Sequence, residues 1–179
     1  MDTCSINCCK YMHSIDDELG ALDVMHFCMF SFRPCFLDDP SYAANIINLC
    51  ITNYNEETFS HCARVTKYAL ENVCLRSNVE REIASIIAMC HDLLEDTSVS
   101  VEDINKAIGC NCPLVINTLK ALTKEKHEPY VEYIKRIKSN DYIYPYVVKL
   151  ADMKDHLTQR ETLTDRLKEK YWNALPYLL

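Results

Sequence analysis

Glycine is scarce in this sequence: only 2 of its 179 residues are glycine. Few positions can therefore adopt the left-handed backbone conformation that tight hairpin turns need. This scarcity disfavours sheets built from hairpins and favours helices joined by polar connectors. The chain is long enough to bury one hydrophobic core and short for two ordinary domains. We therefore expect an all-α, single-domain fold.

The sequence also lacks an apolar run of about 18 residues, the length that a membrane-spanning helix needs. Its start shows no basic segment followed by an apolar stretch and a cleavage site, so the 11 cysteines do not indicate a secreted disulfide framework. We expect a cytoplasmic protein with no membrane partner and with free thiols, of which Cys62, Cys74 and Cys90 are buried. The formal net charge of -7 argues against a nucleic-acid partner. The sequence leaves the oligomeric state open.

The chain is predicted to divide near residue 40 into an N-terminal extension, 1–40, and a helical domain, 41–179. The extension includes a helix over 14–32, and its Cys4, Cys8, Cys9 and His13 match no standard zinc-site spacing. The expected helices of the domain cover 41–52, 55–74, 79–96, 100–109, 113–123, 128–138, 144–156 and 163–175.

One segment of the domain carries an unusual charge pattern. Residues 82–94, EIASIIAMCHDLL, place apolar side chains at the spacing of one buried helix face. The pair His91-Asp92 and the pair Glu95-Asp96 follow on the last turns of this predicted helix. Carboxylates near a helix C-terminus oppose the helix dipole. A divalent cation bound by imidazole nitrogens and carboxylate oxygens would stabilise them.

Such a site needs ligands from elsewhere in the chain, and two residues are candidates. His61 lies on an amphipathic helix, and Asp152 ends the apolar run Val147–Asp152. Together, His61, His91-Asp92 and Asp152 resemble the ligand set of the HD-domain metal-dependent phosphohydrolases. The longer string 91–97, HDLLEDT, resembles the RelA/SpoT-type alarmone hydrolase branch, and the resemblance spans about residues 55–178.

The resemblance implies an HD-type helical bundle with one divalent ion, which in this branch is usually manganese. It implies that His61, His91, Asp92 and Asp152 bind the ion. It further implies that Glu95 and Asp96 are the catalytic pair that orients or deprotonates the attacking water. Five residues are candidates for substrate binding. They are Lys124, Arg166 and Tyr171, which fall near phosphate contacts of that branch, and Lys149 and His156, which flank Asp152.

Two of these candidates have simpler interpretations, and the chain also departs from the branch. Lys149 can balance the charge of the acidic site, and His156 can lie on the surface. The segment before His61, ITNYNEE at 51–57, is acidic and has no glycine, whereas the alarmone hydrolases have a basic, Gly-rich loop there. After Asp152 the chain reads Met-Lys-Asp-His, whereas Arg-Leu-His-Asn is common in the branch.

The expected function is hydrolysis of a small phosphorylated nucleotide. A (p)ppGpp-type 3′-pyrophosphohydrolase fits the string HDLLEDT, and a nucleoside 5′-monophosphatase of the same superfamily fits the altered loop. A nucleotide-binding HD module without catalysis is the third candidate.

Overall fold

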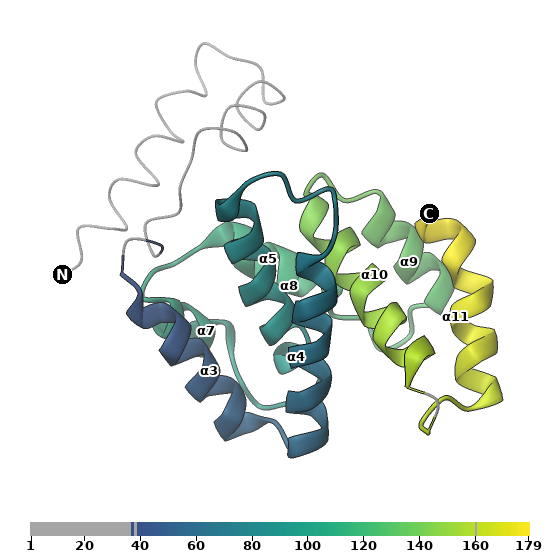
Figure 1. Ribbon diagram of the computed structural model, residues 1–179, viewed down its shortest axis with the longest axis horizontal. Helices are drawn as coiled ribbons and strands as arrows, with labels where there is room; N and C mark the ends of the chain where they lie inside the picture. Colours follow the sequence, from purple (N-terminus) through teal and green to yellow (C-terminus); the bar gives the residue numbers. More distant parts are fainter. Residues whose placement is uncertain (1–36, 38, 160) are drawn as a thin grey trace, which may run out of the picture.

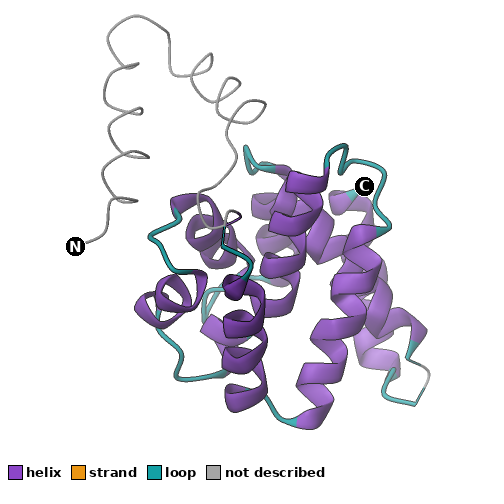
Figure 2. Ribbon diagram, turned by 60° about the vertical axis from the view of Figure 1, so that its left-hand side comes forward, coloured by secondary structure: helices purple, strands orange, loops and turns teal. Residues whose placement is uncertain are grey.

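The computed structural model describes residues 37, 39–159 and 161–179, and these residues form helices and loops without a strand (Figures 1 and 2). The expected all-α fold is confirmed for this part of the chain. The predicted helix over 14–32 and the Cys-rich start lie outside the described residues. The helices are α3 (Ser41–Asn53), α4 (Glu56–Leu70), α5 (Asn78–Cys90), α6 (Leu93–Asp96), α7 (Val101–Ile108), α8 (Pro113–Leu122), α9 (Tyr130–Lys138), α10 (Ile143–Thr158) and α11 (Asp165–Leu178).

Helix α5 is central to the bundle and contacts α3, α4, α8 and α10. Its predicted inner face is buried, since Ile83, Ile86, Ile87 and Cys90 are each at most 4% exposed. Helix α4 packs between α5 and α10, while α9 and α11 pack together on the far side of α10 (Figure 1). One hydrophobic core runs through all these contacts. The helices that carry the candidate ligands are therefore packed side by side.

Side-chain caps mark the starts of four of the nine described helices, α4, α5, α7 and α11. The side chain of Ser77 accepts a hydrogen bond from the Glu80 backbone, and the Glu80 carboxylate accepts one from the Ser77 backbone N–H, as a capping box requires. Ser100 and Asp103 form a second capping box at α7, and Gly109 ends that helix at φ 87°. Glycine is favoured at such a position because other residues are strained at positive φ.

The predicted continuous helix over 79–96 is wrong, because His91 and Asp92 form a turn between α5 and α6, although their backbone angles stay in the αR region. The ring Nδ1–H of His91 donates to the Ala88 carbonyl at 2.8 Å, at the point where α5 ends. The break changes the helix face, so that Leu93 is fully buried and Leu94 only partly. Glu95 and Asp96 thus lie on a separate short helix, and the argument from the dipole of one long helix does not apply to them.

The predicted burial of Cys74 is also wrong, whereas Cys62 and Cys90 are buried free thiols as expected. Helix α4 ends at Leu70 rather than at residue 74. The Cys74 backbone donates to Oδ1 of Asn72 at 2.9 Å, which forms a local turn of the kind that asparagine favours. Cys74 is exposed there, and Leu75 is buried in its place.

Two of the prolines near helix ends, Pro145 and Pro176, are accommodated differently. Pro145 is the third residue of α10, where no intrahelical N–H donor is lost. Pro176 lies inside α11, which extends beyond the predicted end at residue 175. None of the described helices combines the length and the apolarity needed to cross a bilayer.

Candidate metal centre

Three separate parts of the fold bring the four predicted ligands to one cavity of about 480 Å³. His61 comes from the first half of α4, His91 and Asp92 from the break between α5 and α6, and Asp152 from the middle of α10. The Nε2 atom of His61 lies 3.3 Å from Oδ1 of Asp152 and 3.9 Å from Oδ2 of Asp92. The His61 ring thus lies between the carboxylates of Asp92 and Asp152.

The imidazole of His91 is turned toward this cavity. Its Nδ1–H donates a hydrogen bond to the Ala88 carbonyl, and His91 is only 7% exposed. Its Nε2 is buried and makes no hydrogen bond, although Oδ1 of Asp92 lies 3.2 Å away. A buried nitrogen without a hydrogen-bond partner is costly, and a bound cation would satisfy its lone pair.

His61 is oriented by a carboxylate that the sequence analysis missed. Its Nδ1–H donates to Oδ2 of Asp155 at 2.8 Å, so that in the neutral ring Nε2 carries the lone pair. Asp155 is almost fully buried and also accepts two hydrogen bonds from Arg64, at 2.8 and 3.0 Å. Burial alone would raise the pKa of Asp155. Arg64 and His61 stabilise the negatively charged carboxylate more strongly, so the pKa of Asp155 is lowered. Asp155 and Arg64 thus fix the orientation of His61, a candidate ligand.

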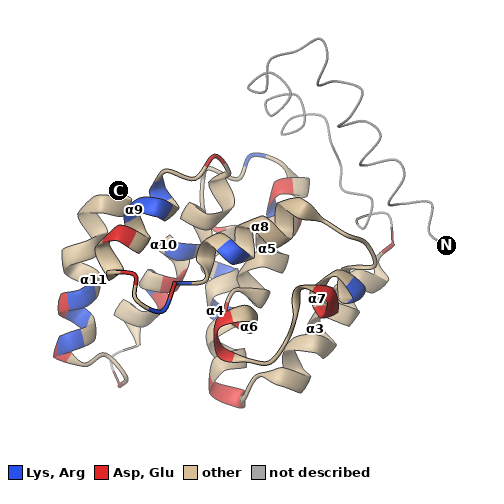
Figure 3. Cartoon of the chain, turned by 180° about the vertical axis from the view of Figure 1, so that it is seen from behind, with Lys and Arg blue, Asp and Glu red and all other residues tan. Residues whose placement is uncertain are grey.

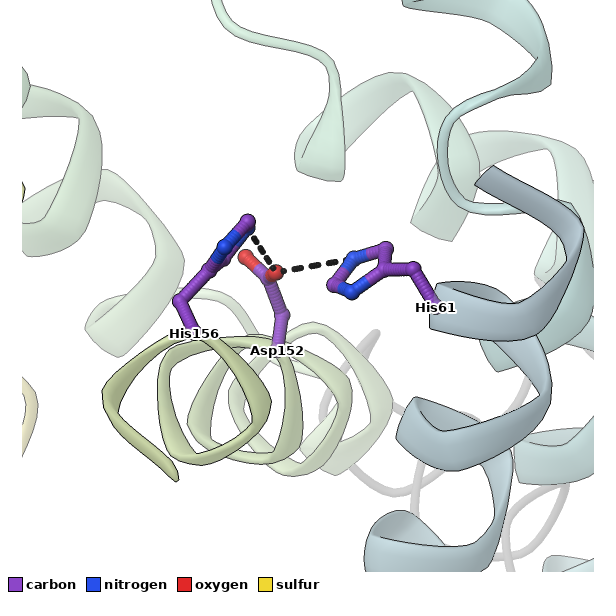
Figure 4. Close-up of side chains that lie close together, drawn as sticks. All are labelled: His61, Asp152 and His156. Carbon is purple, nitrogen blue, oxygen red and sulfur yellow. Dashed lines mark ion pairs between the residues drawn. The ribbon is translucent and has the colours of Figure 1, made fainter. Parts of the chain in front are cut away.

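Three nitrogen atoms lie close to the Asp152 carboxylate, and Figure 4 shows the rings of His61 and His156, which provide two of them. Its Oδ1 lies 3.3 Å from His61 Nε2 and 3.2 Å from His156 Nε2, and its Oδ2 lies 2.5 Å from Lys149 Nζ. Burial opposes the charged form, but the ammonium of Lys149 and the two imidazoles outweigh it and hold the pKa of Asp152 well below its usual range. Burial likewise opposes the charge of His61, and the carboxylates of Asp152, Asp155 and Asp92 raise the pKa of His61 to about 9.

The donor atoms form two groups that can hold a metal ion. One group is His61, His91 and Asp92, and the other is His61, Asp152 and His156; within each group all ligand atoms lie within 4.8 Å of one another. Imidazole and carboxylate are the ligands that first-row divalent metals prefer. The unpartnered His91 nitrogen, the oriented His61 nitrogen and the donor types therefore fit a divalent cation.

The predicted catalytic pair lies at the edge of the same cavity. Glu95 and Asp96 both line it and are exposed. Burial, together with the charges of Asp92 and Glu95, raises the pKa of Asp96. Oε2 of Glu95 accepts a hydrogen bond from the backbone of Lys124 at 3.0 Å. The structure thus places both carboxylates beside the ligand cluster.

The predicted substrate contacts divide into two sets. Lys149, His156 and Tyr171 line the cavity, and the rings of His156 and Tyr171 stack with centroids 5.3 Å apart. Lys124 and Arg166 are not among the cavity-lining residues: the Lys124 ammonium donates to the carbonyls of Glu125 and Glu128, and Arg166 is exposed on α11.

Lys170 was not predicted as a site residue. It is one of several basic residues along α11 (Figure 3). Its Nζ lies 4.2 Å from the ring centroid of Tyr130 and 5.1 Å from that of Tyr171. Burial and the nearby charge of Lys149 lower the pKa of Lys170. The only available signal was its position one residue before Tyr171.

Comparison of the chain with protein-family models, with curated proteins and with solved structures gave no match.

Proposed function

We propose that this protein is a metal-dependent phosphohydrolase that acts on a small phosphorylated nucleotide. The observation that carries the proposal is the joint presence, in one cavity, of a His/Asp cluster that can hold a cation and of two further carboxylates, Glu95 and Asp96. Manganese is the proposed ion, in accord with the resemblance of the sequence to the HD-domain phosphohydrolases. A divalent ion in such a site supplies a Lewis acid for a phosphoryl oxygen and lowers the pKa of water.

The residues of the chain have distinct parts in this proposal. His61, His91, Asp92 and Asp152 hold the ion, and Asp155 keeps the Nε2 lone pair of His61 directed inward. The raised pKa of Asp96 brings this carboxylate closer to the basicity that a proton acceptor needs near neutral pH. Glu95 orients the attacking water and is itself held by the Lys124 backbone.

The opposite side of the cavity supports an anionic substrate. Lys149 and His156 lie on α10, and Tyr171 lies on α11 next to Lys170. Ammonium groups bind phosphate as point charges, and aromatic rings can stack on a nucleobase. We assign a phosphate contact to Lys149, and Tyr171, which is only 4% exposed and stacks on His156, supports this side of the cavity from α11.

Two reactions remain candidates within this function. The string HDLLEDT favours removal of a 3′-pyrophosphate from an alarmone-type nucleotide. The acidic segment 51–57, at the end of α3 and the start of α4, favours a 5′-monophosphatase because it brings no basic loop near His61. A binding module without turnover requires no water-activating carboxylates. The cavity contains Glu95 and Asp96, and these residues favour an enzyme over a binding module.

A nucleotide screen tests the proposal. The full chain with Mn²⁺ is incubated with guanosine 3′,5′-bisdiphosphate and with nucleoside 5′-monophosphates, and released pyrophosphate and phosphate are measured separately. We expect release from one of the two classes. The Glu95→Gln/Asp96→Asn double variant should lose about 100- to 10,000-fold in rate and should keep its Mn²⁺ affinity.

The matched control replaces two exposed acids outside the cavity, as Glu102→Gln/Asp141→Asn, and should behave as the unmodified protein. A protein that binds Mn²⁺ but hydrolyses no nucleotide in the screen would contradict the enzymatic proposal and favour the binding module.

A further inference from the structure

We propose that His156 is a metal ligand and not a substrate contact, so that the cation has five protein donors in place of the four implied by the resemblance. This inference rests on the proposed function. Nε2 of His156 lies 3.2 Å from Oδ1 of Asp152, the same oxygen that lies 3.3 Å from Nε2 of His61. All three atoms are within 4.8 Å of one another, a spacing that suits one ion.

The direction of the ring supports a ligand role. Figure 4 shows the imidazoles of His61 and His156 on opposite sides of the Asp152 carboxylate, both turned toward it. The two ring centroids are 4.7 Å apart. The Nε2 atom of His156 therefore faces the ligand cluster, where a cation would lie.

The ring is also held in place before any ion binds. His156 follows Asp152 by one helical turn, so both side chains project from the same face of α10. On its other side the ring stacks on Tyr171, with an angle of 18° between the ring planes. Tyr171 is only 4% exposed and is anchored in the core. A ligand ordered in this way loses little conformational entropy when metal binds.

The fifth donor changes the chemistry of the site. With His156 the cation has three imidazole and two carboxylate ligands, and without it two of each. Imidazole suits later first-row metals such as cobalt, nickel and zinc, whereas carboxylates suit manganese and magnesium. Removal of His156 should therefore weaken Co²⁺ binding more than Mn²⁺ binding.

The test uses the full-length chain as the unmodified protein, as His156→Asn and as His156→Gln. His127→Asn is the matched control, because His127 is an exposed loop histidine outside the cavity. Affinities for Co²⁺ and Mn²⁺ are measured by calorimetric titration, and the visible absorption of bound Co²⁺ reports its ligands. Circular dichroism verifies that each variant is folded.

We expect both His156 variants to bind Co²⁺ at least about 10-fold more weakly, to lose less Mn²⁺ affinity, and to change the Co²⁺ spectrum. The control should match the unmodified protein. Unchanged Co²⁺ affinity and spectrum in a folded variant would overturn the inference, and with a raised KM for nucleotide they would assign His156 to substrate binding. If the unmodified protein binds neither ion, the proposed function itself is contradicted. This outcome differs from failure of the His156 inference, in which the unmodified protein binds metal and the His156 variants bind it equally well.

Discussion

The two walls of the cavity differ in how their charges are balanced. On the wall formed by α4, α6 and the end of α5, no Lys or Arg side chain of the described residues forms an ion pair with Asp92, Glu95 or Asp96. On the wall formed by α10 and α11, Asp152 is paired with the largely buried ammonium of Lys149. The acids of the first wall thus have no Lys or Arg partner, whereas Asp152 on the second wall has one. Under the proposed function, the metal ion would compensate the acids of the first wall, with Asp152 as a further ligand from the second.

The largest effect is expected from the first wall. Asp92→Ala removes a carboxylate that the bound ion needs, and we expect loss of Mn²⁺ binding and a rate lower by at least about 1000-fold, because the ion supplies several kcal/mol of transition-state stabilisation. Metal titration and a hydrolysis assay measure both losses. Asp141→Asn, outside the cavity, is the control. Full turnover in Asp92→Ala would rule out the proposed centre.

The second wall can be tested by removing its own cation. Lys149→Met leaves the buried Asp152 carboxylate without its ammonium partner, which costs about 3–5 kcal/mol for a buried pair. A metal ion would replace the lost charge. We therefore expect the metal-free variant to be strongly destabilised and to gain more stability from Mn²⁺ than the unmodified protein does.

Urea unfolding with and without Mn²⁺ measures this difference. The control is Lys154→Met, which lies on the same helix as Lys149 and loses an exposed ion pair with Glu71 at the end of α4. An equal gain from Mn²⁺ in Lys149→Met and in the unmodified protein would show that Lys149 and the ion do not compensate the same carboxylate.

A smaller effect is expected from Asp155, which lies on α10 and contacts His61 and Arg64 of the first wall. Asp155→Asn keeps the shape of the side chain but removes the charge that holds His61 and Arg64. Loss of such an outer-shell partner lowers metal affinity by about 10- to 100-fold. Calorimetric titration with Mn²⁺ measures the change, and Glu71→Gln serves as an exposed control. An affinity equal to that of the unmodified protein would show that Asp155 has only a structural role.

The smallest effect concerns a pair away from both walls. Arg136 donates two hydrogen bonds to Glu128, at 2.7 and 2.8 Å, and also contacts the carbonyls of Ala121 and Thr123. The hydrogen bonds from Arg136 lower the pKa of Glu128 below its ordinary value. Because the folded pKa is the lower one, the pair stabilises the fold above about pH 4.3, the ordinary value, and this contribution is lost as the pH falls through the folded pKa.

Glu128→Gln should therefore lower the free energy of unfolding by about 1 kcal/mol at pH 7 and by less at pH 3. Glu132→Gln is the matched control, since Glu132 and its partner Lys135 are about half exposed, 59% and 48%. Chemical unfolding at the two pH values measures both variants. An equal loss for Glu128→Gln at the two pH values would contradict the ionic origin of the effect.

Local signals in the sequence predicted much of the fold. The capping residues Ser77 and Ser100 and the terminal Gly109 act within one helical turn, and the structure shows them at the predicted helix ends. The apolar spacing of 82–94 predicted the buried face of α5 correctly as far as Cys90. It missed the break at His91, because a continuous period predicts Leu94 as the next buried residue and the structure buries Leu93.

The candidate site, too, could be predicted from the sequence only where local signals mark its residues. His61, His91, Asp92 and Asp152 were identified from short strings, and the structure brings them to one cavity. Asp155 was missed, although it follows Asp152 by three residues, because its partners His61 and Arg64 lie more than 90 residues earlier. Only the packing of α4 against α10 reveals that contact.

The number of Mn²⁺ ions bound per chain tests the central claim most directly. The full-length protein is equilibrated with Mn²⁺ at neutral pH, and free and bound ion are distinguished by electron paramagnetic resonance. The His/Asp cluster predicts one tightly bound ion per chain, which a His61→Asn/His91→Asn variant loses. No bound ion at saturating Mn²⁺, or full binding by that double variant, would contradict the account.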